Sequence, residues 1–428
     1  NLTLTGAAAI NGIGNALANT LVGNSDRNFL YGRDGDDHIE AGDGSDHLYG
    51  GLGADHLDGG EGFDYVRYDD ADYGSVTVDL SNLALNAGGA LGDTFVSIEG
   101  ASGGAGDDTI TGSGVNNTLF GMGGNAQLFG HGGNDTLVGG AGGDRLDGGA
   151  GVDTVNYVDQ TADLTINLAN GIASGGDASG ETLVSFEIFY AGAGDDTVFG
   201  YCFAYYLGGG AGNDSLLGAG GNDTLRGGDG NDSFNPGAGA DVVDGGAGTD
   251  RVTYYSQTAN LVIDLTTGTA SGGEATGDTL ISIESITSGS GDDTITGNAS
   301  SNVIDGMIGN DTLDGLGGND MVRGGDGDDT ITGGTGNDSL SGGSGDDTFV
   351  FDDAWGADTI SDFAAGLDQI DMTAAGNITS FQDLVDNHVR ETAGVLEIFD
   401  GANVVRLAGY AMSDMGVTIN ANDFLFAP

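Results

Sequence analysis

Apolar and polar positions recur every nine residues over much of the chain, most regularly from Gly306 to Val350. In that stretch five consecutive nonapeptides read GMIGNDTLD, GLGGNDMVR, GGDGDDTIT, GGTGNDSLS and GGSGDDTFV. Each combines Gly-rich turn residues with an Asp at the sixth position and one apolar residue at the eighth. A single apolar side chain per unit indicates a short strand that is stable only when it stacks on its neighbours. The pattern therefore predicts a solenoid of stacked β-strands.

Three longer units interrupt the nonapeptides and begin at Gly59, Gly148 and Gly245. Each contains a segment of alternating apolar and polar residues, followed by one of the related phrases GDTFVSIE, GETLVSFE and GDTLISIE. Alternation with a period of two is typical of a strand with one face against a core. We therefore interpret the units as longer rungs of the same solenoid. The alternating segments are Val76–Leu80, Leu164–Leu168 and Leu261–Leu265.

From Phe351 onward the nine-residue period ends, and short strand patterns alternate with one possible helix from Ser380 to His388. A stack of repeats needs a terminal unit that covers the exposed end of its core. We therefore expect this tail to form a small cap on the last rung.

Acidic residues dominate the charge of the chain. Its 428 residues include 66 Asp and Glu against 9 basic residues, a formal net charge of −57. Such an excess repels nucleic acid and anionic membrane surfaces, so neither is an expected partner. No run of about 18 apolar residues predicts a membrane span. The charge also opposes folding unless cations neutralise it, and the single Cys202 cannot form an internal disulfide.

The turn GGxGxD offers the two kinds of oxygen that Ca²⁺ prefers, carboxylates and backbone carbonyls. Its glycines allow positive φ angles, so consecutive carbonyls can face one side. Because Ca²⁺ takes about six to eight ligands, one site needs two neighbouring turns. We predict several Ca²⁺ ions as cofactors. The predicted ligands are Asp37, Asp46, Asp55, Asp64, Asp108, Asp135, Asp144, Asp153, Asp196, Asp214, Asp223, Asp232, Asp241, Asp250, Asp293, Asp311, Asp320, Asp329, Asp338 and Asp347.

Several turns depart from this pattern at the sixth position. Ala126 replaces the Asp in GMGGNAQLF, and Asn28, Asn117, Asn302 and Tyr205 occupy the same place in other copies. None of these side chains supplies the negative charge of a carboxylate. We therefore expect calcium sites at these turns to be lost or weakened.

Three histidines, His38, His47 and His56, follow the repeat Asp at nine-residue spacing. If two nonapeptides form one coil, His38 and His56 stack on one face and His47 lies opposite. A two-histidine site for a transition metal is one interpretation. An outward, solvated position is the alternative, and we favour it.

Aromatic residues gather from Phe199 to Tyr206, where the other long units have small polar residues. Exposed at alternate positions, they would form a platform that stacks on sugar rings or docks a partner. Alternatively they pack on the preceding rung, against Phe186, Phe189 and Tyr190, which we favour. For Cys202 we expect a packed thiol, because no histidine lies near it in the sequence.

The nonapeptides resemble the repeats of the RTX (repeats-in-toxin, hemolysin-type) family over most of residues 14–350. The tail, with GADTISDF and DQIDM, resembles the C-terminal region of serralysin-type metalloproteases. The resemblance implies a calcium-filled parallel β-roll in which two nonapeptides form one coil. It also implies type I secretion from a Gram-negative bacterium through an uncleaved C-terminal signal, matched here by NANDFLFAP, and a further ligand in Asp358.

The expected fold is all-β: a right-handed parallel β-roll or β-solenoid stapled by calcium, with three longer-rung units and a small C-terminal cap. We expect five parts. They are 1–67 with N-terminal β-roll repeats, 68–147 with the first long unit, 148–244 with the second, 245–350 with the third and the regular calcium repeats, and 351–428 with the cap and secretion signal.

No catalytic motif is found in the sequence. The HExxH zinc motif of serralysins is absent. The letters GxSxG occur at Gly100–Gly104, but in a Gly-rich repeat context without a strand, turn and helix around the serine. We therefore predict that these residues do not form an enzyme. Since the chain begins in a phrase that reads as the interior of a repeat, a catalytic domain before Asn1 stays open.

Three hypotheses for the function follow. The leading one is a secreted, extracellular or cell-surface, calcium-binding protein with a structural or adhesive role in a surface layer, matrix or filament. Its candidate partners besides calcium are polysaccharide and other copies of itself. The second is the non-catalytic secretion and folding region of a larger extracellular enzyme, a protease or a polysaccharide-modifying enzyme. The third is a carbohydrate-binding solenoid.

Overall fold

Short β-strands stacked in parallel account for most of the chain, as the nine-residue period predicts. The structure, a computed structural model, describes residues 1–70, 73–352 and 354–427. Its described residues form two compact units, Asn1–Gly200 with Tyr205–Gly212, and Tyr201–Ala204 with Asn213–Pro428. Within the described part, no helix is long and apolar enough to cross a membrane. The parallel stack of strands confirms the predicted all-β solenoid. The five-part division stays a prediction.

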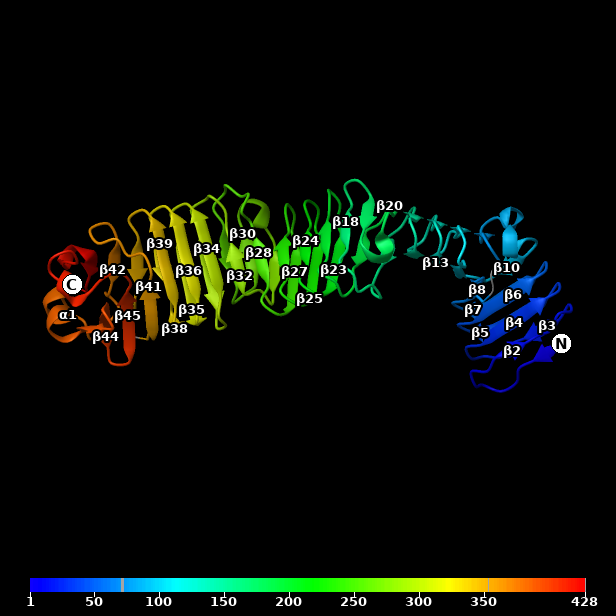
Figure 1. Ribbon diagram of the computed structural model, residues 1–428, viewed down its shortest axis with the longest axis horizontal. Helices are drawn as coiled ribbons and strands as arrows, with labels where there is room; N and C mark the ends of the chain where they lie inside the picture. Colours follow the sequence, from blue (N-terminus) through cyan, green and yellow to red (C-terminus); the bar gives the residue numbers. More distant parts are fainter. Residues whose placement is uncertain (71–72, 353, 428) are drawn as a thin grey trace. The chain divides into compact units, whose positions relative to one another are not determined.

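The first unit opens with regular rungs. Strands β3 (Thr20–Val22), β5 (His38–Gly44) and β7 (His56–Gly62) stack in one parallel sheet. Strands β2 (Gly12–Ile13), β4 (Phe29–Asp34), β6 (His47–Leu52) and β8 (Tyr65–Arg67) stack in a second one (Figure 1). Leu21 pairs with Ile39 and Ile39 with Leu57, a spacing of 18 residues. Two nonapeptides therefore form one coil, and their eighth residues fill its core.

The other strands of this unit either extend these two sheets or belong to a third sheet, which begins at β9. They are β1 (Leu2–Thr3), β9 (Thr77–Asp79), β10 (Thr94–Val96), β11 (Gly100–Ser102), β12 (Thr109–Thr111), β13 (Thr118–Gly123), β14 (Gln127–Phe129), β15 (Thr136–Ala141), β16 (Arg145–Asp147), β17 (Thr154–Asn156), β18 (Thr165–Asn167), β19 (Ile172–Ser174), β20 (Thr182–Val184), β21 (Ile188–Tyr190), β22 (Thr197–Phe199) and β23 (Tyr206–Ala211).

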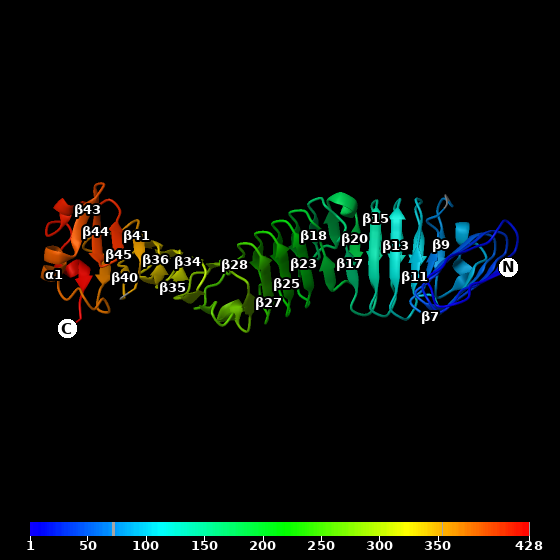
Figure 2. The same cartoon turned by 90° about the horizontal axis from the view of Figure 1, so that it is seen from below.

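The second unit contains the most regular stack. Its nonapeptides alternate between two parallel ladders, β33 to β40 in one and β34 to β39 in the other, and successive strands of each lie side by side in Figures 1 and 2. The eighth residues of the five perfect repeats are fully buried. The strands are β24 (Ser215–Leu217), β25 (Thr224–Asp229), β26 (Ser233–Asn235), β27 (Val242–Ala247), β28 (Arg251–Thr253), β29 (Val262–Asp264), β30 (Thr269–Ser271), β31 (Thr279–Ile281), β32 (Ser285–Thr287), β33 (Thr294–Asn298), β34 (Val303–Ile308), β35 (Thr312–Gly318), β36 (Met321–Asp326), β37 (Thr330–Thr332), β38 (Thr335–Gly336), β39 (Ser339–Ser344) and β40 (Thr348–Val350).

The long units are longer rungs of the solenoid, and each alternating segment contains a strand of a ladder: β9, β18 and β29. They differ from the sequence prediction in one respect, because the second and third are not parallel throughout. Strand β19 runs antiparallel between β18 and β20, and β30 does the same between β29 and β31. Turns at Gly171 and Gly268, with φ angles of 67° and 66°, reverse the chain there.

The tail covers the last rung of the second unit. Strands β41 (Ala357–Ile360) and β42 (Gln369–Asp371) continue its two ladders, and β45 (Asn403–Leu407) and β46 (Phe424–Leu425) pair with them in turn. Strands β43 (Val389–Thr392), β44 (Val395–Asp400) and β45 form an antiparallel sheet.

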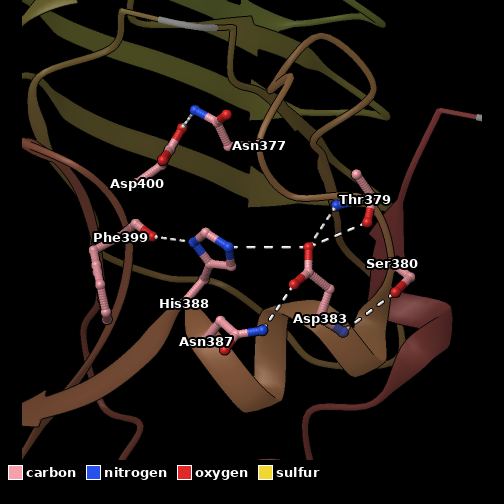
Figure 3. A network of polar contacts seen from close by, with 8 residues as sticks. All are labelled: Asn377, Thr379, Ser380, Asp383, Asn387, His388, Phe399 and Asp400. Atoms are coloured by element: carbon pink, nitrogen blue, oxygen red, sulfur yellow. Dashed lines mark hydrogen bonds and ion pairs between the residues drawn. The ribbon is translucent and has the colours of Figure 1, made fainter.

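The helix expected near Ser380 to His388 is present as α1 (Phe381–Asn387). Ser380 caps its N-terminus, because its Oγ accepts a hydrogen bond of 3.2 Å from the Asp383 N–H. At the other end His388 Nδ1 donates to the Phe399 carbonyl oxygen over 2.9 Å and fixes the helix to β44 (Figure 3). Thr379 and Asn387 donate to the Asp383 carboxylate and lower its pKa.

Candidate metal centres

The predicted aspartates all lie at the start of a strand with their carboxylates turned into the stack. Each of the twenty is 3% exposed or less. In the regular stretches the Oδ1 atom accepts a hydrogen bond from the backbone N–H of the sixth residue one coil earlier, as in Asp329, which accepts from the Asp311 N–H over 2.8 Å. After the long units the donors are instead the N–H groups of Val76, Leu164 and Leu261. The row of carboxylates therefore forms a continuous hydrogen-bonded column along the turns.

The second carboxylate oxygen, Oδ2, has no such partner at most of these positions. A buried carboxylate oxygen without a hydrogen bond is costly and calls for a cation or a proton. The predicted ligands whose Oδ2 is buried and without a hydrogen-bond donor in the described part of the chain are Asp37, Asp46, Asp55, Asp64, Asp135, Asp144, Asp153, Asp232, Asp241, Asp250, Asp311, Asp320, Asp329, Asp338 and Asp347.

Where a turn begins with glycine, the missing side chain leaves the space that these oxygens face. A Cβ built on Gly324 would lie 2.0 Å from Asp329 Oδ2 and 2.6 Å from the carbonyl oxygen of Gly342, one coil later. At Gly306 the corresponding distances to Asp311 Oδ2 and the Gly324 carbonyl are 2.3 and 2.7 Å. Any side chain would close this space. The paired carboxylate and carbonyl oxygens are the hard donors that suit Ca²⁺.

Burial raises the pKa of these carboxyl groups, because desolvation disfavours the charged form. The pKa rises to about 6 at Asp46, Asp135, Asp232, Asp329 and Asp347. It rises to about 7 at Asp55, Asp64, Asp311 and Asp320. The backbone N–H that each Oδ1 accepts opposes the rise only in part. Without a cation, the folded stack therefore holds its carboxylates in an unfavourable state at neutral pH.

Three predicted ligands differ from the rest because their own turn occupies Oδ2. The backbone N–H groups of Gly104, Gly192 and Gly289 donate to it over 2.6, 3.1 and 3.3 Å. The acceptors are Asp108, Asp196 and Asp293, each in the first nonapeptide after a long unit. Their role as metal ligands remains a prediction.

Where the sixth residue is Asn, its side-chain amide donates a hydrogen bond to a backbone carbonyl, which replaces part of the contact that a carboxylate would make with a cation. The Nδ2 of Asn28 donates to the Ile10 carbonyl over 2.9 Å, and that of Asn117 donates to the Glu99 carbonyl over 2.8 Å. Asn302 donates to the Glu284 carbonyl over 3.3 Å. Tyr205 is buried at this position and packs edge-on against Phe189. At the three Asn positions the side chain thus makes a neutral contact to the coil before, while the backbone N–H still donates to an Asp of the next coil.

The sequence prediction missed three acids that take the place of the repeat Asp inside the long rungs. Asp93 pairs with the coil of Asp55, since its Oδ1 accepts the Asp55 N–H over 2.8 Å, and Asp278 does the same for Asp241 over 2.9 Å. Glu181 occupies the corresponding place beside Asp144. All three come from the phrases GDT, GET and GDT, whose resemblance to the end of a nonapeptide was the available signal.

A buried tyrosine accompanies each of these acids. The hydroxyl groups of Tyr68 and Tyr254 donate to Asp93 Oδ2 over 2.6 Å and to Asp278 Oδ2 over 2.8 Å, and Tyr157 donates to Glu181 Oε2. The tyrosines are 4% exposed or less. A hydroxyl donor therefore stands at the carboxylate oxygen that elsewhere in the stack has no donor.

The substitution Tyr254→Phe is expected to lower the free energy of unfolding in saturating calcium by about 1.5–3 kcal/mol, because it removes a buried hydrogen bond to a charged group. Urea denaturation followed by circular dichroism measures this change. Tyr255→Phe is the matched control, since Tyr255 is 63% exposed. Equal unfolding free energies for the two variants would show that the buried hydroxyl contributes nothing.

Asp358, in the tail, also continues the column of repeat aspartates. It is fully buried, and its Oδ1 accepts the Asp338 N–H over 2.9 Å. Its Oδ2 has no donor among the described residues, and burial together with the nearby Asp338 raises its pKa to about 8. These are the features of the repeat positions, so the proposed ligand role of Asp358 suits its surroundings.

The histidines lie as the 18-residue coil requires. The His38 and His56 rings stack with centroids 4.8 Å apart, while His47 belongs to the other sheet. His38 Nε2 lies 2.8 Å from Glu40 Oε1, and His56 Nδ1 lies 2.8 Å from Thr94 Oγ1. Among the described residues no three His, Cys, Asp or Glu side chains converge on one metal position.

Two expectations for the aromatic segment need correction. Cys202 is exposed, not packed. Tyr201 and Phe203 are also exposed, by 53% and 64%, so the packed arrangement that we favoured applies only to the residues that follow. Tyr205 and Tyr206 contact Phe189 and Tyr190.

Comparisons with known proteins agree with this geometry. The family model of the RTX calcium-binding nonapeptide repeat matches more than half of the chain and segments of both units. The matched residues are 13–48, 34–66, 102–137, 129–157, 187–201, 208–243, 237–254, 287–322 and 323–353. No curated protein matches the chain.

Two solved structures are weakly similar. The extracellular lipase LipA from Serratia marcescens is 20% identical with a TM-score of 0.20, over 54% of this chain and 40% of the lipase chain. The match thus spans less than half of the lipase. A hyperactive, Ca²⁺-dependent, β-helical antifreeze protein from an Antarctic bacterium is 16% identical with a TM-score of 0.18, over 81% of this chain and 84% of its own.

The repeat period, the 18-residue coil and the columns of buried carboxylates are thus accompanied by a family match across the same residues. The chain belongs to the family of proteins built from RTX calcium-binding nonapeptide repeats.

Proposed function

We propose that this chain is a secreted protein that folds when it meets extracellular calcium and then serves as a structural or adhesive component of a surface layer, matrix or filament. One observation carries the proposal: at fifteen repeat positions a buried carboxylate oxygen faces the turn with no hydrogen-bond donor in the described part of the chain. RTX repeats bind multiple Ca²⁺ ions. A cation bound in each turn would contact the carboxylate oxygens that have no hydrogen-bond donor.

The charge and the cysteine content support an extracellular site of folding. The net charge of −57 opposes a compact state where free calcium is scarce. Binding of the metal to the folded but not to the unfolded chain then drives folding. A chain with one cysteine gains no stability from internal disulfides outside the cell, so the metal takes over that role.

We also propose type I export through the C-terminal region, which resembles that of serralysins. The support is that this region forms a cap on the last calcium rungs and joins both ladders through β41 and β42. Of the signal phrase, residues 420–427 lie within the described part of the chain, whereas Pro428 does not. Folding of this cap would give the stack a finished end outside the cell.

The repeat aspartates are the proposed calcium ligands, and Asp329→Asn tests them. The change keeps the size of the side chain but removes the charged donor, so we expect fewer Ca²⁺ ions per chain and a higher calcium concentration for half-maximal folding. Isothermal titration calorimetry and circular dichroism measure both quantities.

The neighbouring Asp328→Asn is the matched control for the same loss of charge. Asp328 is exposed, and its Oδ1 accepts the Asp346 N–H over 2.9 Å. An Asn retains this bond, as Asn310 does when it accepts the Asp328 N–H. Equal calcium stoichiometry and midpoints in the two variants would reject Asp329 as a ligand.

A further inference from the structure

The outer face of the sheet formed by β4, β6 and β8 carries two rows of stacked rings. In the first row, the centroids of Phe29 and His47 are 4.6 Å apart and those of His47 and Tyr65 are 5.0 Å apart, with nearly parallel planes. In the second row Tyr31 and Tyr49 stack at 4.4 Å. We call this surface the aromatic face; its strands lie in the N-terminal part of the first unit (Figure 1).

A hollow of about 420 Å³ lies beside the first row. Its lining combines the rings of His47, Tyr65 and two further phenylalanines with the guanidinium groups of two arginines. Phe63 lies 5.3 Å from Tyr65, centroid to centroid, and Phe120 lies 6.3 Å from it at a steep angle. The rings therefore line the hollow at different tilts, and its volume can hold one sugar ring.

The arginines that line the hollow are Arg27 and Arg67, in a chain with only 9 basic residues against 66 acids. The exposed Arg27 guanidinium lies 4.7 Å from the Phe29 ring centre, and in the described part of the chain no acidic side chain is within ion-pair distance of it. Arg67 is held by Asp69, with its Nη1 3.4 Å from His47 Nδ1. Arg27 thus has a guanidinium group available for an anion.

The His47 imidazole lies between the Phe29 and Tyr65 rings of the first row. Its Nδ1 accepts from Arg67 Nη1, so the ring also contacts one of the two arginines. A ligand in the hollow therefore meets stacked rings beside the side chains of Arg27 and Arg67.

We propose that the aromatic face binds sugar chains that carry carboxylates, with one uronate ring seated in the hollow. Rings such as Tyr65 and Phe63 offer apolar faces to the C–H groups of a sugar. A guanidinium group presents a planar pair of donors that matches a carboxylate. This combination distinguishes the hollow from the stacked pair His38 and His56 on the other sheet, where Glu40 supplies a negative charge.

The large negative charge of the chain limits which anions can reach the hollow. A densely charged polyanion such as nucleic acid is repelled along the chain, whereas a sugar polymer with spaced carboxylates is repelled less. The proposal supplies a ligand for the adhesive role and rests on that part of the proposed function. Calcium-dependent folding is measured separately, so failure of one can be told from failure of the other.

The test uses the full chain in saturating calcium and two tetrasaccharides. A hyaluronan tetrasaccharide carries glucuronate, and fully N-acetylated chitotetraose, called chitotetraose below, is a neutral chain of comparable size. Isothermal titration calorimetry is expected to show binding of the hyaluronan fragment, with chitotetraose about tenfold weaker or more because it lacks the charged group. Arg27→Gln should weaken hyaluronan binding about tenfold, and Tyr65→Ala should weaken it at least as much.

The matched controls are Arg226→Gln and Tyr255→Ala, which remove an arginine and an exposed tyrosine of the second unit. They should bind like the unaltered chain, and circular dichroism should show that all four variants fold with the same calcium midpoint. Absence of hyaluronan binding by the folded protein would overturn the proposal. So would equal affinities of the Arg27→Gln and Arg226→Gln variants, or equal binding of the two sugars.

Discussion

Chelation of calcium with EGTA is expected to abolish most of the β-sheet signal in far-ultraviolet circular dichroism, and added Ca²⁺ should restore it. Each nonapeptide buries one large apolar residue and one carboxylate, as Ile331 and Asp329 do. Burying an ionised carboxylate without a partner costs several kcal/mol, more than the roughly 1.5–3 kcal/mol gained from one aliphatic side chain. We therefore expect that the stack does not form at neutral pH without the metal.

The matched condition replaces Ca²⁺ with Mg²⁺ at the same concentration. Mg²⁺ demands a small octahedral shell and gives up its waters reluctantly, so it should restore much less of the signal. On producing cells, the chelator should also release the protein from the surface layer or matrix that we propose for it. A β signal that persists in EGTA would contradict the requirement for calcium, and full recovery with Mg²⁺ would contradict its selectivity.

Acid should replace calcium. After EGTA treatment and dialysis into calcium-free buffer, lowering the pH from 8 to about 5 is expected to recover much of the β signal that chelation removes. The buried carboxyl groups have folded-state pKa values of about 6 at Asp329 and Asp347 and about 7 at Asp311 and Asp320. An unfolded Asp titrates near 3.9. Because the folded pKa is the higher one, stability from protonation is complete below about pH 4 and is lost as the pH rises through about 6 to 7.

At pH 5 the protein stays above its isoelectric point of about 4.1. At the isoelectric point itself it would precipitate. Size-exclusion chromatography at pH 5 serves as the control for aggregation. In saturating calcium the same pH change should instead weaken folding, because protons compete with the metal for the carboxylates. If the metal-free chain stays disordered at pH 5, the negative charge of the carboxylates is not the cause that prevents its folding.

Periodicity predicts most of the regular fold, because its cause is local. One apolar residue in nine and a fixed turn leave few alternatives to a stacked coil, and the 18-residue pairing of Leu21, Ile39 and Leu57 follows. The same holds for the helix α1, whose cap at Ser380 lies within the sequence pattern. The antiparallel strands β19 and β30 were not predicted, because a Gly-rich turn allows the next strand to pair in either direction.

The sequence also predicts the repeat aspartates as a buried row, yet not which of their oxygens lack a donor. Asp108 and Asp329 occupy the same position in the repeat, but only Asp108 receives a second N–H, from Gly104. That difference depends on how the long unit before Asp108 ends. Likewise the pair of Tyr68 and Asp93 joins residues 25 positions apart across an insert. Such contacts arise from tertiary packing, which no local pattern records.

Hydrogen bonds to the repeat aspartates give the column of carboxylates a direction. The N–H of Asp311 donates to Asp329, and the N–H of Asp329 donates to Asp347, so each of these carboxylates accepts from the coil before it. The next residue bonds in the opposite sense, because the Thr330 N–H donates to the Asp311 carbonyl oxygen. Neighbouring coils are therefore linked by bonds in both directions, and a coil at the end of the stack needs a further rung to complete both sets.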